Sequence, residues 1–511
     1  MEEINSNVLW DTVLLNTFII EKKKCKVYFH RGTFIWENEA PPHTRNTLLL
    51  DDVIAVDYMF KKQRCCHNNK VHFSKPNSSQ EFSNITQPVG FCIHYALHEK
   101  QNKWRHHKLL LTTNETRHTI SWVNTLQALY KGLLQRPKQI IVFVNPFGGK
   151  RKGLQIYEQI AKPLFDIAGI EIDLTVTQRA NHARDILESE DLSKFDGIVC
   201  VGGDGTFSEI MNGLLIRTAR DEGIDPNNLD NELPRPKLRI GVIPGGSTDT
   251  VAYCIHGTTD IETAVLHVII GESAGLDVSS VHNEHSLLCY YASVISYGYL
   301  GDIIRDSDKF RWMGPKRYDF SGFKKFLVNQ GYEGEIMLAT NSSNAPEDSK
   351  CFKDCQRCLS QKDIRLDDDT TQDWKTIRGK FLMVNGANLS CACPRSPNGI
   401  SPHCHMGDGC LDLVLVKHTS LINNLRLLLT LSNKMKTIYD LPFVEVHRTK
   451  RFSFRALPLC ARTASDVSVW NCDGEILFDT FLQIRSHCQL LQVFFRGIEA
   501  SLDDNQRCSC F

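Results

Sequence analysis

The sequence predicts a multidomain protein of α/β plus β class, in which a doubly wound α/β domain lies between two mainly β regions. Over residues 135–285, apolar strand-like runs alternate with helical patterns, which is typical of a parallel sheet. Short runs of alternating polarity dominate residues 1–128, and strand-like runs return over 286–511 with few helices between them. We expect this last region to be an antiparallel, β-sandwich-like lid domain, interrupted by a polar insertion at 341–373.

The composition is that of a globular protein without a strong overall electric field. The 511 residues include 59 Lys+Arg and 59 Asp+Glu, so the net charge gives no reason to expect nucleic acid as a partner. The N-terminal Met-Glu-Glu-Ile lacks the features of a signal peptide, and no run reaches the ~18 apolar residues of a spanning helix. We therefore expect a cytoplasmic protein whose 19 cysteines are reduced thiols or metal ligands rather than disulfides.

The first 128 residues predict a small β module closed by one helix. Strand-like runs occur at 25–29, 33–36 and 53–56, and apolar residues recur at helical spacing over 118–130, around Trp122. Many short strands followed by a tryptophan-bearing helix resemble a pleckstrin-homology domain. The resemblance implies a β barrel that targets the protein to membranes.

Three basic clusters in this module could contact a membrane surface. They lie at residues 22–24, 61–64 and 103–108, and anionic lipid head groups attract clusters of this kind. Solvated loops on a small barrel are the alternative, and for any single cluster they are the safer interpretation.

Three glycine-bearing loops directly follow strand-like runs in the α/β domain. The runs and their loops are, in chain order, 139–144 with 145–149, 198–201 with 202–205, and 239–243 with 244–248. In a parallel sheet such loops gather beyond the carboxyl ends of the strands. Glycines there let backbone N–H groups approach a ligand closely, and a helix start after the loop favours phosphate. The sequence therefore predicts one phosphate site built from three loops.

Asp204, in Gly202-Gly-Asp-Gly205, is unexpected in such a site. A carboxylate among phosphate-binding amides is repelled by the ligand unless it meets a metal ion or a substrate hydroxyl. The alternative is that Asp204 caps the helix that follows.

The three loops together resemble the diacylglycerol-kinase-type catalytic domain of lipid kinases. The resemblance rests on Asn145-Pro-Phe-Gly-Gly-Lys150, Gly202-Gly-Asp-Gly205 and Pro244-Gly-Gly-Ser-Thr248. Downstream, the stretches at 297–302, 306–311 and 317–320 look like the lipid-side block of sphingosine and ceramide kinases, and Asp473-Gly-Glu475 matches a late family motif.

Two features narrow the resemblance to the ceramide kinase family. One is the pleckstrin-like module, which sphingosine kinases lack. The other is Cys351-x-x-x-Cys355-x-x-Cys358. The resemblance implies transfer of the γ-phosphate of ATP to the primary hydroxyl of ceramide, with Mg²⁺ bound to ATP. It makes Asp204 the base that accepts the hydroxyl proton.

The resemblance also implies two sets of binding residues. For ATP it implies Asn145, Pro146, Phe147, Gly148, Gly149, Thr177, Gln178, Arg179, Ala180, Asn181, Gly205, Glu209, Gly246, Ser247, Thr248, Arg311, Arg317, Asp473, Gly474 and Glu475. For the lipid it implies Gly202, Gly203, Asp204, Gly205 and Asp302. Arg311 and Arg317 would neutralise charge on the transferring phosphate. The alternative for Asp302 is that it caps the turn that follows it.

Two further features have open interpretations. Cys351, Cys355 and Cys358, with Cys391 and Cys393, could hold zinc, or they are buried structural thiols. Ile422, Leu429 and Met435 have the spacing of a calmodulin-binding helix, as ceramide kinases are thought to have, which would make Ca²⁺ a regulator; the alternative is a core-facing stripe.

Rival functions remain at this stage. A sphingosine or diacylglycerol kinase belongs to the same class of enzyme, whereas a catalytically silent membrane-lipid sensor belongs to another. The resemblance to ceramide kinases further implies a peripheral membrane protein of the Golgi and plasma membrane.

Overall fold

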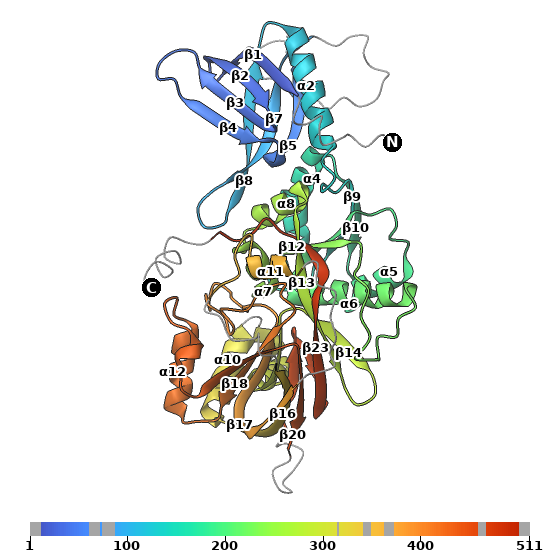
Figure 1. The fold of residues 1–511 in the computed structure, drawn as a ribbon, viewed down its shortest axis with the longest axis vertical. Coiled ribbons are helices and arrows are strands. Elements are labelled where there is room, and N and C mark those ends of the chain that lie inside the picture. The colour runs from blue at the N-terminus through green and yellow to red at the C-terminus, as the bar shows by residue number, and fades with distance from the viewer. Residues whose placement is uncertain are drawn as a thin grey trace. The chain divides into compact units, whose positions relative to one another are not determined.

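A computed structural model describes residues 12–60, 72–73, 87–313, 316–340, 349–361, 373–457 and 467–499 (Figure 1). Contacts divide the chain into two compact units. The first comprises the chain up to residue 138 together with residues 161–171 and 265–272, and the second comprises the remainder. Among the described helices, none is both long enough and apolar enough to cross a membrane.

The first unit contains an eight-stranded sheet with the order β4-β3-β2-β1-β8-β7-β5-β6, whose paired strands are antiparallel. The strands are β1 (Val13–Ile20), β2 (Lys23–His30), β3 (Thr33–Asn38), β4 (Arg45–Leu49), β5 (Val53–Phe60), β6 (His72–Phe73), β7 (Pro88–His98) and β8 (Trp104–Thr112). The helices are η1 (Leu50–Asp52), α2 (Thr116–Lys131), α4 (Lys162–Ala168) and the greater part of α8 (Ile261–Ile270).

Alternating side chains explain why this sheet closes around a core. On β2, Cys25, Val27 and Phe29 are buried, whereas Lys26 between them is exposed and Tyr28 is half-buried. Trp122 of α2 is fully buried, stacks on Phe91, and donates a hydrogen bond from Nε1 to Asn16 Oδ1 at 2.7 Å. The predicted antiparallel β module closed by a tryptophan-bearing helix is therefore confirmed.

Two of the three basic clusters lie among the described residues. Residues 22–24 form the turn from β1 into β2, where Lys24 pairs with Glu39 at 3.0 Å. Residues 103–108 lie at the start of β8. The cluster at 61–64 lies outside the described residues.

The second unit is built on one 15-stranded mixed sheet. Its main path has the order β10-β9-β11-β12-β23-β20-β16-β17-β15-β21-β22, with β13, β14, β18 and β19 paired off this path. The strands are β9 (Gln139–Val144), β10 (Glu171–Val176), β11 (Gly197–Gly202), β12 (Arg239–Pro244), β13 (Ser273–His282), β14 (Leu287–Tyr291), β15 (Val294–Gly298), β16 (Tyr332–Thr340), β17 (Asp373–Ala387), β18 (Leu411–Lys417), β19 (Val444–Thr449), β20 (Arg451–Ala456), β21 (Trp470–Cys472), β22 (Glu475–Leu477) and β23 (Phe481–Phe494).

Helices accompany both parts of this sheet. They are α3 (Gly153–Ile156), η3 (Tyr157–Ala161), α5 (His182–Ser189), α6 (Asp204–Asp221), α7 (Thr250–His256), α9 (Tyr299–Ser307), η4 (Asp308–Met313), α10 (Lys316–Val328), α11 (Gln356–Ser360), α12 (Leu421–Leu431) and η6 (Ile438–Asp440). Every residue of β11 is buried, and α6 packs on the same core through Phe207, Ile210 and Met211. The strand–loop–helix order thus gives the predicted α/β core.

The parallel and antiparallel parts share one sheet, because β12 pairs in parallel with the long C-terminal strand β23. β9, β11 and β12 are parallel to one another, whereas β23 pairs antiparallel with both β13 and β20. The mainly antiparallel character predicted beyond residue 286 is confirmed, and its role as a lid stays a prediction. Of the expected insertion at 341–373, residues 349–361 and the first residue of β17 are described, and the remainder lies outside the described residues.

Candidate active site

The three glycine loops converge at the carboxyl ends of β9, β11 and β12. The N–H of Gly245 donates to Gly202 O at 2.9 Å, which joins the third loop to the second. A Cβ on Gly246 would lie 2.6 Å from the Cα of Gly203, and one on Gly149 would lie 2.5 Å from the carbonyl carbon of Gly246. Gly149 also has a φ of +52°. These loops touch backbone to backbone, which requires glycine, and their predicted convergence is confirmed.

Asn145 fixes the first loop from inside. Its Oδ1 accepts hydrogen bonds from the N–H groups of Phe147 at 2.9 Å and Gly148 at 3.0 Å, which closes a tight turn. Its Nδ2 donates to Thr206 Oγ1 on α6 at 2.9 Å. Pro146 lies within this turn, and the Phe147 side chain is 65% exposed. The turn therefore holds its backbone in place through Asn145 and leaves its aromatic tip open to a ligand.

Asp204 is the first residue of α6, and Gly203 rather than Asp204 is the N-cap residue. Its carboxylate accepts hydrogen bonds from the N–H groups of Thr250 at 3.1 Å and Val251 at 2.9 Å, both in the first turn of α7. Asp204 thus caps α7 and not its own helix, so the capping alternative is wrong in its original form. Burial raises the pKa of Asp204, and the α7 N–H groups act in the opposite direction.

The negative charge of Asp204 raises the pKa of two other aspartates, Asp249 and Asp473. Asp249, with φ of +55°, accepts a hydrogen bond from the N–H of Gly246 at 2.7 Å, and burial raises the pKa of its carboxyl to about 6. Burial likewise raises the pKa of Asp473 to about 6. In both cases backbone hydrogen bonds lower the pKa and the negative charge of Asp204 raises it further. The sequence analysis missed Asp249, although it directly follows the third glycine loop.

Both carboxylate oxygens of Asp473 accept hydrogen bonds from backbone N–H groups. They accept from the N–H groups of Ala292 at 2.9 Å, Ser293 at 3.2 Å and Val294 at 2.9 Å. Asp473 and Gly474 both have positive φ and form the turn between β21 and β22. The geometry makes Asp473 a residue that positions this turn, and the turn presents Glu475.

Glu209 and Glu475 form an acidic pair beside α5. Burial raises the pKa of Glu209, backbone N–H groups of Asn181 and Ala183 lower it, and the charge of Glu475 raises it. Asn181 has φ of +59° and is the N-cap residue of α5. The predicted ATP segment at 177–181 therefore lies next to Glu209.

Other members of this segment are held by local contacts. Thr177 is buried, with its Oγ1 donating to Val144 O at 3.3 Å. The N–H of Gln178 donates to His182 Nδ1 at 3.2 Å, and Arg179 pairs with Asp185 at 2.6 Å. Ala180 accepts from Arg179 Nη1 at 3.3 Å. The segment is thereby ordered before any ligand binds.

Fewer contacts are described for the remaining predicted ATP residues. Gly205, Ser247 and Thr248 are exposed, and a Cβ at Gly205 would meet nothing within 4 Å. Arg317 donates from Nη2 to Tyr318 Oη at 2.6 Å. The side chain of Arg311 lies outside the described residues.

Asp302 lies inside α9 with its carboxylate buried at 2% exposure. Its Oδ1 accepts from Ser468 Oγ at 2.7 Å and from Arg305 Nη2 at 2.9 Å, and its Oδ2 accepts from Tyr332 Oη. Lys325 Nζ lies 3.8 Å from Oδ2. Arg305 belongs to the same helix, but Ser468, Tyr332 and Lys325 come from other segments, and no backbone N–H of the following turn is among the named donors. Asp302 therefore does not serve as a local cap. It is a paired, buried carboxylate.

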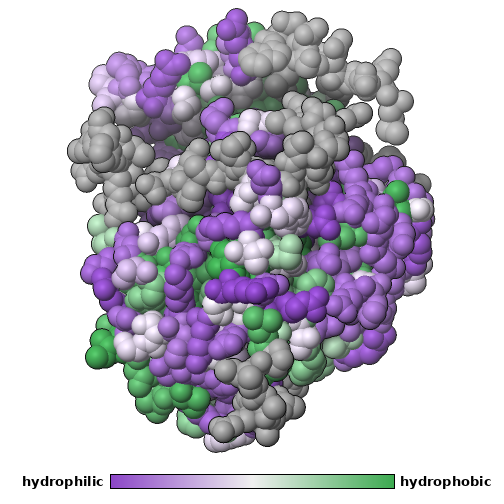
Figure 2. Space-filling view, turned by 60° about the horizontal axis from the view of Figure 1, so that its bottom comes forward, coloured by the Kyte–Doolittle hydropathy of each residue, from purple (hydrophilic) through white to green (hydrophobic). Residues whose placement is uncertain are grey.

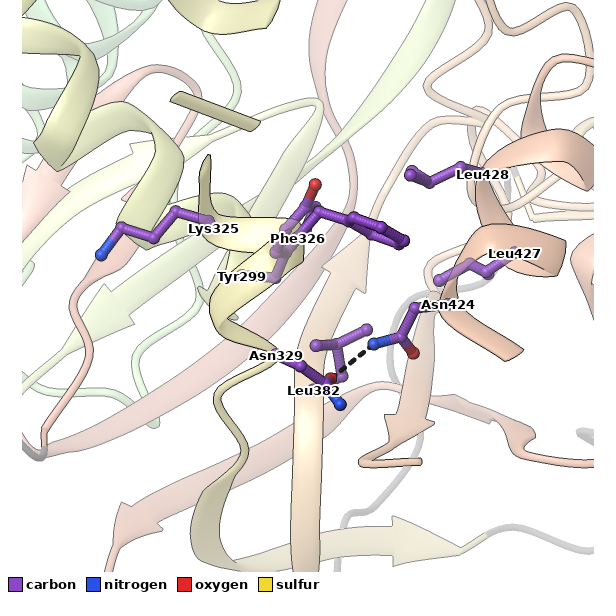
Figure 3. Close-up of a pocket in the computed structure, with 8 residues that line it drawn as sticks. All are labelled: Tyr299, Lys325, Phe326, Asn329, Leu382, Asn424, Leu427 and Leu428. Carbon is purple, nitrogen blue, oxygen red and sulfur yellow. Dashed lines mark hydrogen bonds between the residues drawn. The ribbon is translucent and has the colours of Figure 1, made fainter. Parts of the chain in front are cut away.

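A small pocket with mainly apolar walls is connected to Asp302 through Lys325, which is one of its lining residues and whose Nζ lies 3.8 Å from Asp302 Oδ2. Figure 3 shows this pocket. Lys325 contributes to its edge and extends away from it, and Tyr299 donates from its hydroxyl to Gly322 O at 3.0 Å. Across the pocket, Asn424 Nδ2 donates to Asn329 Oδ1 at 2.6 Å, which ties α12 to the end of α10. Its lining residues are Tyr299, Lys325, Phe326, Asn329, Leu382, Asn424, Leu427 and Leu428.

The outer face of α12 is apolar and exposed. On α12, Ile422 is 79% exposed and Leu429 62%; Met435, which follows the end of the helix, is 67% exposed. Hydrophobic side chains reach the surface at the lower left of the view in Figure 2, on the side where α12 lies in Figure 1. Phe323 and Leu327 of α10 are also more than half exposed. The interpretation of the 422–435 stripe as a core face is therefore wrong.

Cys391 and Cys393 lie apart from the three-cysteine motif. Cys391 Sγ donates to Leu389 O at 3.3 Å and lies 3.7 Å from Ser293 Oγ, and Cys393 forms an isolated bridge with Ser396. The expectation that they join Cys351, Cys355 and Cys358 in a metal site is wrong. Within the described residues, His405 completes that group instead.

Two family models and a solved structure are similar to parts of this chain. The diacylglycerol kinase catalytic domain matches residues 139–281, and the ceramide kinase C-terminal domain matches 293–511. A solved structure of a diacylglycerol kinase from Bacillus anthracis is 15% identical, with a TM-score of 0.45, and covers 70% of this chain and 97% of that one.

Two curated relatives are similar over nearly their whole length. The ceramide kinase of Mus musculus is 39% identical over 498 residues, covering 90% of this chain and 91% of that protein. The ceramide kinase of Homo sapiens is 40% identical over 498 residues, covering 90% of both chains. Identity at this level over both the nucleotide and the C-terminal parts shows that the chain belongs to the ceramide kinase family.

Proposed function

We propose that this protein transfers the γ-phosphate of ATP to the primary hydroxyl of ceramide and so forms ceramide 1-phosphate. The observation that carries this proposal is the place of the Asp204 carboxylate. It lies where three glycine loops meet, on the N–H groups of α7, in a chain of the ceramide kinase family.

In the proposed step, the ceramide oxygen forms a bond to the γ-phosphorus while the bond from that phosphorus to the ADP oxygen breaks. The hydroxyl proton passes to Asp204. Because the transition state of phosphoryl transfer is loose, the proton leaves late and a carboxylate suffices as base. A pKa raised by burial makes Asp204 a stronger base than an exposed aspartate, and the two α7 N–H groups fix its orientation.

ATP is proposed to bind along the three loops and the segment at 177–181. Exposed backbone N–H groups of these loops suit phosphate oxygens, and the exposed Phe147 is a surface for the nucleotide. Mg²⁺ would neutralise the phosphate charge during transfer. The carboxylates of Glu209 and Glu475 fit such an ion, because oxygen ligands suit it and their mutual repulsion would be relieved.

The lipid is proposed to bind at Asp302 and at the apolar pocket that Lys325 connects to it. The carboxylate can accept hydrogen bonds from the amide N–H and hydroxyl of a ceramide head group if a bound lipid replaces one of its present partners. Lys325, the most distant of these at 3.8 Å, is the partner most easily displaced. The neighbouring Tyr299, Phe326 and Leu427 offer apolar surface to a hydrocarbon chain.

The N-terminal module is proposed to be a pleckstrin-homology-like domain that brings the enzyme to anionic membranes from the cytoplasm. Its sheet order, its C-terminal helix and the exposed lysines at 22–24 support this role. The division into 1–128, 135–285 and 286–511 is part of the same proposal, as is residence at the Golgi and plasma membrane.

Calcium regulation is proposed to act through calmodulin on α12. Ile422 and Leu429 are exposed on α12, which supports a binding helix, since calmodulin takes the apolar face of a helix into its groove. Met435 is also exposed but follows the end of α12, so the full spacing would require the helix to extend on binding.

A lipid panel tests the proposed function. Purified full-length protein is given labelled ATP, Mg²⁺ and mixed micelles of ceramide, sphingosine or diacylglycerol, and the labelled lipid is identified. We expect label in ceramide. Label in sphingosine or diacylglycerol would favour the rival kinases, and no label in any lipid would favour a silent sensor.

A further inference from the structure

Four potential metal ligands that belong to neither proposed substrate site lie close together in the second unit. The Sγ atoms of Cys351, Cys355 and Cys358 and one ring nitrogen of His405 all lie within 4.8 Å of one another. Sγ of Cys351 is 3.7 Å from Sγ of Cys358, and Sγ of Cys355 is 3.1 Å from Nδ1 of His405. Zn–S bonds of ~2.3 Å at tetrahedral angles place two sulfurs about 3.8 Å apart. The observed sulfur separation is close to that value.

We propose that Cys351, Cys355, Cys358 and His405 bind a structural Zn²⁺ ion. Three thiolates and one imidazole form a complete tetrahedral ligand set, which is characteristic of structural rather than catalytic zinc. Soft sulfur ligands also argue against Mg²⁺ and Ca²⁺, which take oxygen ligands. Binding displaces the thiol protons into solvent, so that three S–H bonds are exchanged for three Zn–S bonds without any change of oxidation state.

A disulfide is the main alternative for these cysteines. It would need an S–S distance of about 2.05 Å, whereas the closest sulfurs with a measured separation, those of Cys351 and Cys358, lie 3.7 Å apart. A disulfide would also leave the third thiol and the buried His405 without a role. The closeness of all four potential ligand atoms therefore favours a bound metal ion.

The segment that carries the thiols is folded so that its cysteines face one point. Asp354 has φ of +57°, which turns the chain before Cys355, and Cys355 is the N-cap residue of α11. Cys358 lies on this helix, and its carbonyl accepts from Gln489 Nε2 of β23 at 2.8 Å. Contacts outside the cluster therefore set the position of the ligand-bearing turn.

His405 reaches the cluster from the long connection between β17 and β18. The residue is 2% exposed and presents Nδ1 to the sulfurs. Its Nε2 lies 3.5 Å from Ser349 Oγ. Metal-binding histidines commonly direct the second ring nitrogen toward an oxygen that fixes the ring orientation, and Ser349 is placed to do this.

The connection that carries His405 also contacts α7, the helix whose N–H groups donate hydrogen bonds to Asp204. Cys254 of α7 has its Sγ 3.4 Å from Ser390 Oγ and 3.8 Å from Ala392 O. A zinc ion would therefore anchor one end of a loop whose other end supports α7. Loss of the ion should loosen this loop first and should lower kinase activity through α7.

Metal content tests the proposal on the full-length wild-type protein. Prepared without chelators, it should contain about one equivalent of zinc by mass spectrometry of metals. Replacement by Co²⁺ should give the visible absorption bands of a tetrahedral site together with thiolate-to-metal charge transfer. Protein that neither contains zinc nor retains added Zn²⁺ or Co²⁺ through gel filtration would overturn the proposal, as would a Cys351–Cys358 disulfide found by peptide mapping.

Variants then test the ligand set. Cys355→Ser and His405→Ala should lose the metal, and hydrogen exchange over 404–410 should become faster. His405→Cys should retain it, because a thiolate can replace an imidazole in such sites. Cys289→Ser, a half-buried cysteine outside the cluster, is the matched control and should keep the full equivalent. Zinc retained by both Cys355→Ser and His405→Ala would contradict the assignment, and the cobalt spectrum of the wild type remains decisive if a variant fails to fold.

Discussion

The site proposed for the nucleotide (the nucleotide side) and the site proposed for the lipid (the lipid side) are constructed in different ways. On the nucleotide side, backbone groups of three loops touch one another, and each loop is a few residues directly after a strand. On the lipid side, Asp302 is surrounded by side chains from α9, α10, β16 and the segment before β21. The nucleotide side is specified by local sequence. The lipid side depends on contacts between distant residues, such as Asp302 and Ser468, which are 166 residues apart. The two sides should therefore respond differently to substitution.

Asp204→Asn is expected to have the largest effect. The amide cannot accept the hydroxyl proton, so kcat should fall by ~10²–10⁴-fold. ATP affinity and thermal stability should change little, because one side-chain oxygen can still accept a hydrogen bond from α7. Steady-state kinetics with an ATP-binding measurement check this. A variant with near wild-type kcat would exclude Asp204 as the base.

Asp302→Asn is expected to act on the lipid instead. Hydrogen bonds to a charged group contribute ~1.5–3 kcal/mol, so the lipid KM should rise by roughly tenfold or more, while the ATP KM stays near its wild-type value. Ser468→Ala, which removes a neutral donor to the same carboxylate, is the matched control and should have a smaller effect. A loss of stability with unchanged lipid kinetics would leave Asp302 a purely structural residue.

Asp204 lies in a local sequence motif and Asp302 is held by distant residues, and this difference explains which parts of the site the sequence could predict. Glycines directly after apolar runs indicate where loops meet, because a parallel sheet brings its strand ends together, and the three loops were placed correctly. The partners of Asp302 were not predictable: Tyr332, Lys325 and Ser468 reach it through tertiary packing. The pairing of β12 with β23, which joins Ile240 to Val493, could not be predicted from the sequence either.

The sequence could likewise indicate that three cysteines form a group but not that His405 joins them. The sequence could not decide whether Ile422, Leu429 and Met435 face the core or the solvent, because an apolar stripe has the same spacing in both cases. Burial decides between the two, and burial depends on the rest of the fold.

Two glycine variants test whether the loops of the nucleotide side depend on backbone contact. Gly246→Ala should destabilise the protein by ~1–3 kcal/mol, because its Cβ would be forced against the backbone of Gly203. Gly205→Ala, in the same site, has free space around the added Cβ and should leave stability unchanged or slightly raised. Chemical denaturation measures both. Equal destabilisation would argue against the backbone contact of the loops.

The smallest effect on folding is expected at α12. Ile422→Gln and Leu429→Gln replace exposed side chains and should change the free energy of unfolding by less than about 0.5 kcal/mol. Together they should abolish binding of calcium-loaded calmodulin. Phe478→Gln, which changes a residue that is 71% exposed elsewhere, should not. Wild-type protein that fails to bind calmodulin, or variants that lose binding to vesicles instead, would assign this face to another partner.

The pH dependence of kcat for ceramide tests the central claim most directly, namely that Asp204 accepts the hydroxyl proton. Burial raises the pKa of Asp204, and a base must be ionised, so the rate should fall as the pH is lowered through that raised pKa rather than near the ordinary value of 3.8. Asp302→Asn should keep this acid limb, whereas the residual activity of Asp204→Asn should lack it. An unchanged acid limb in Asp204→Asn would contradict the account.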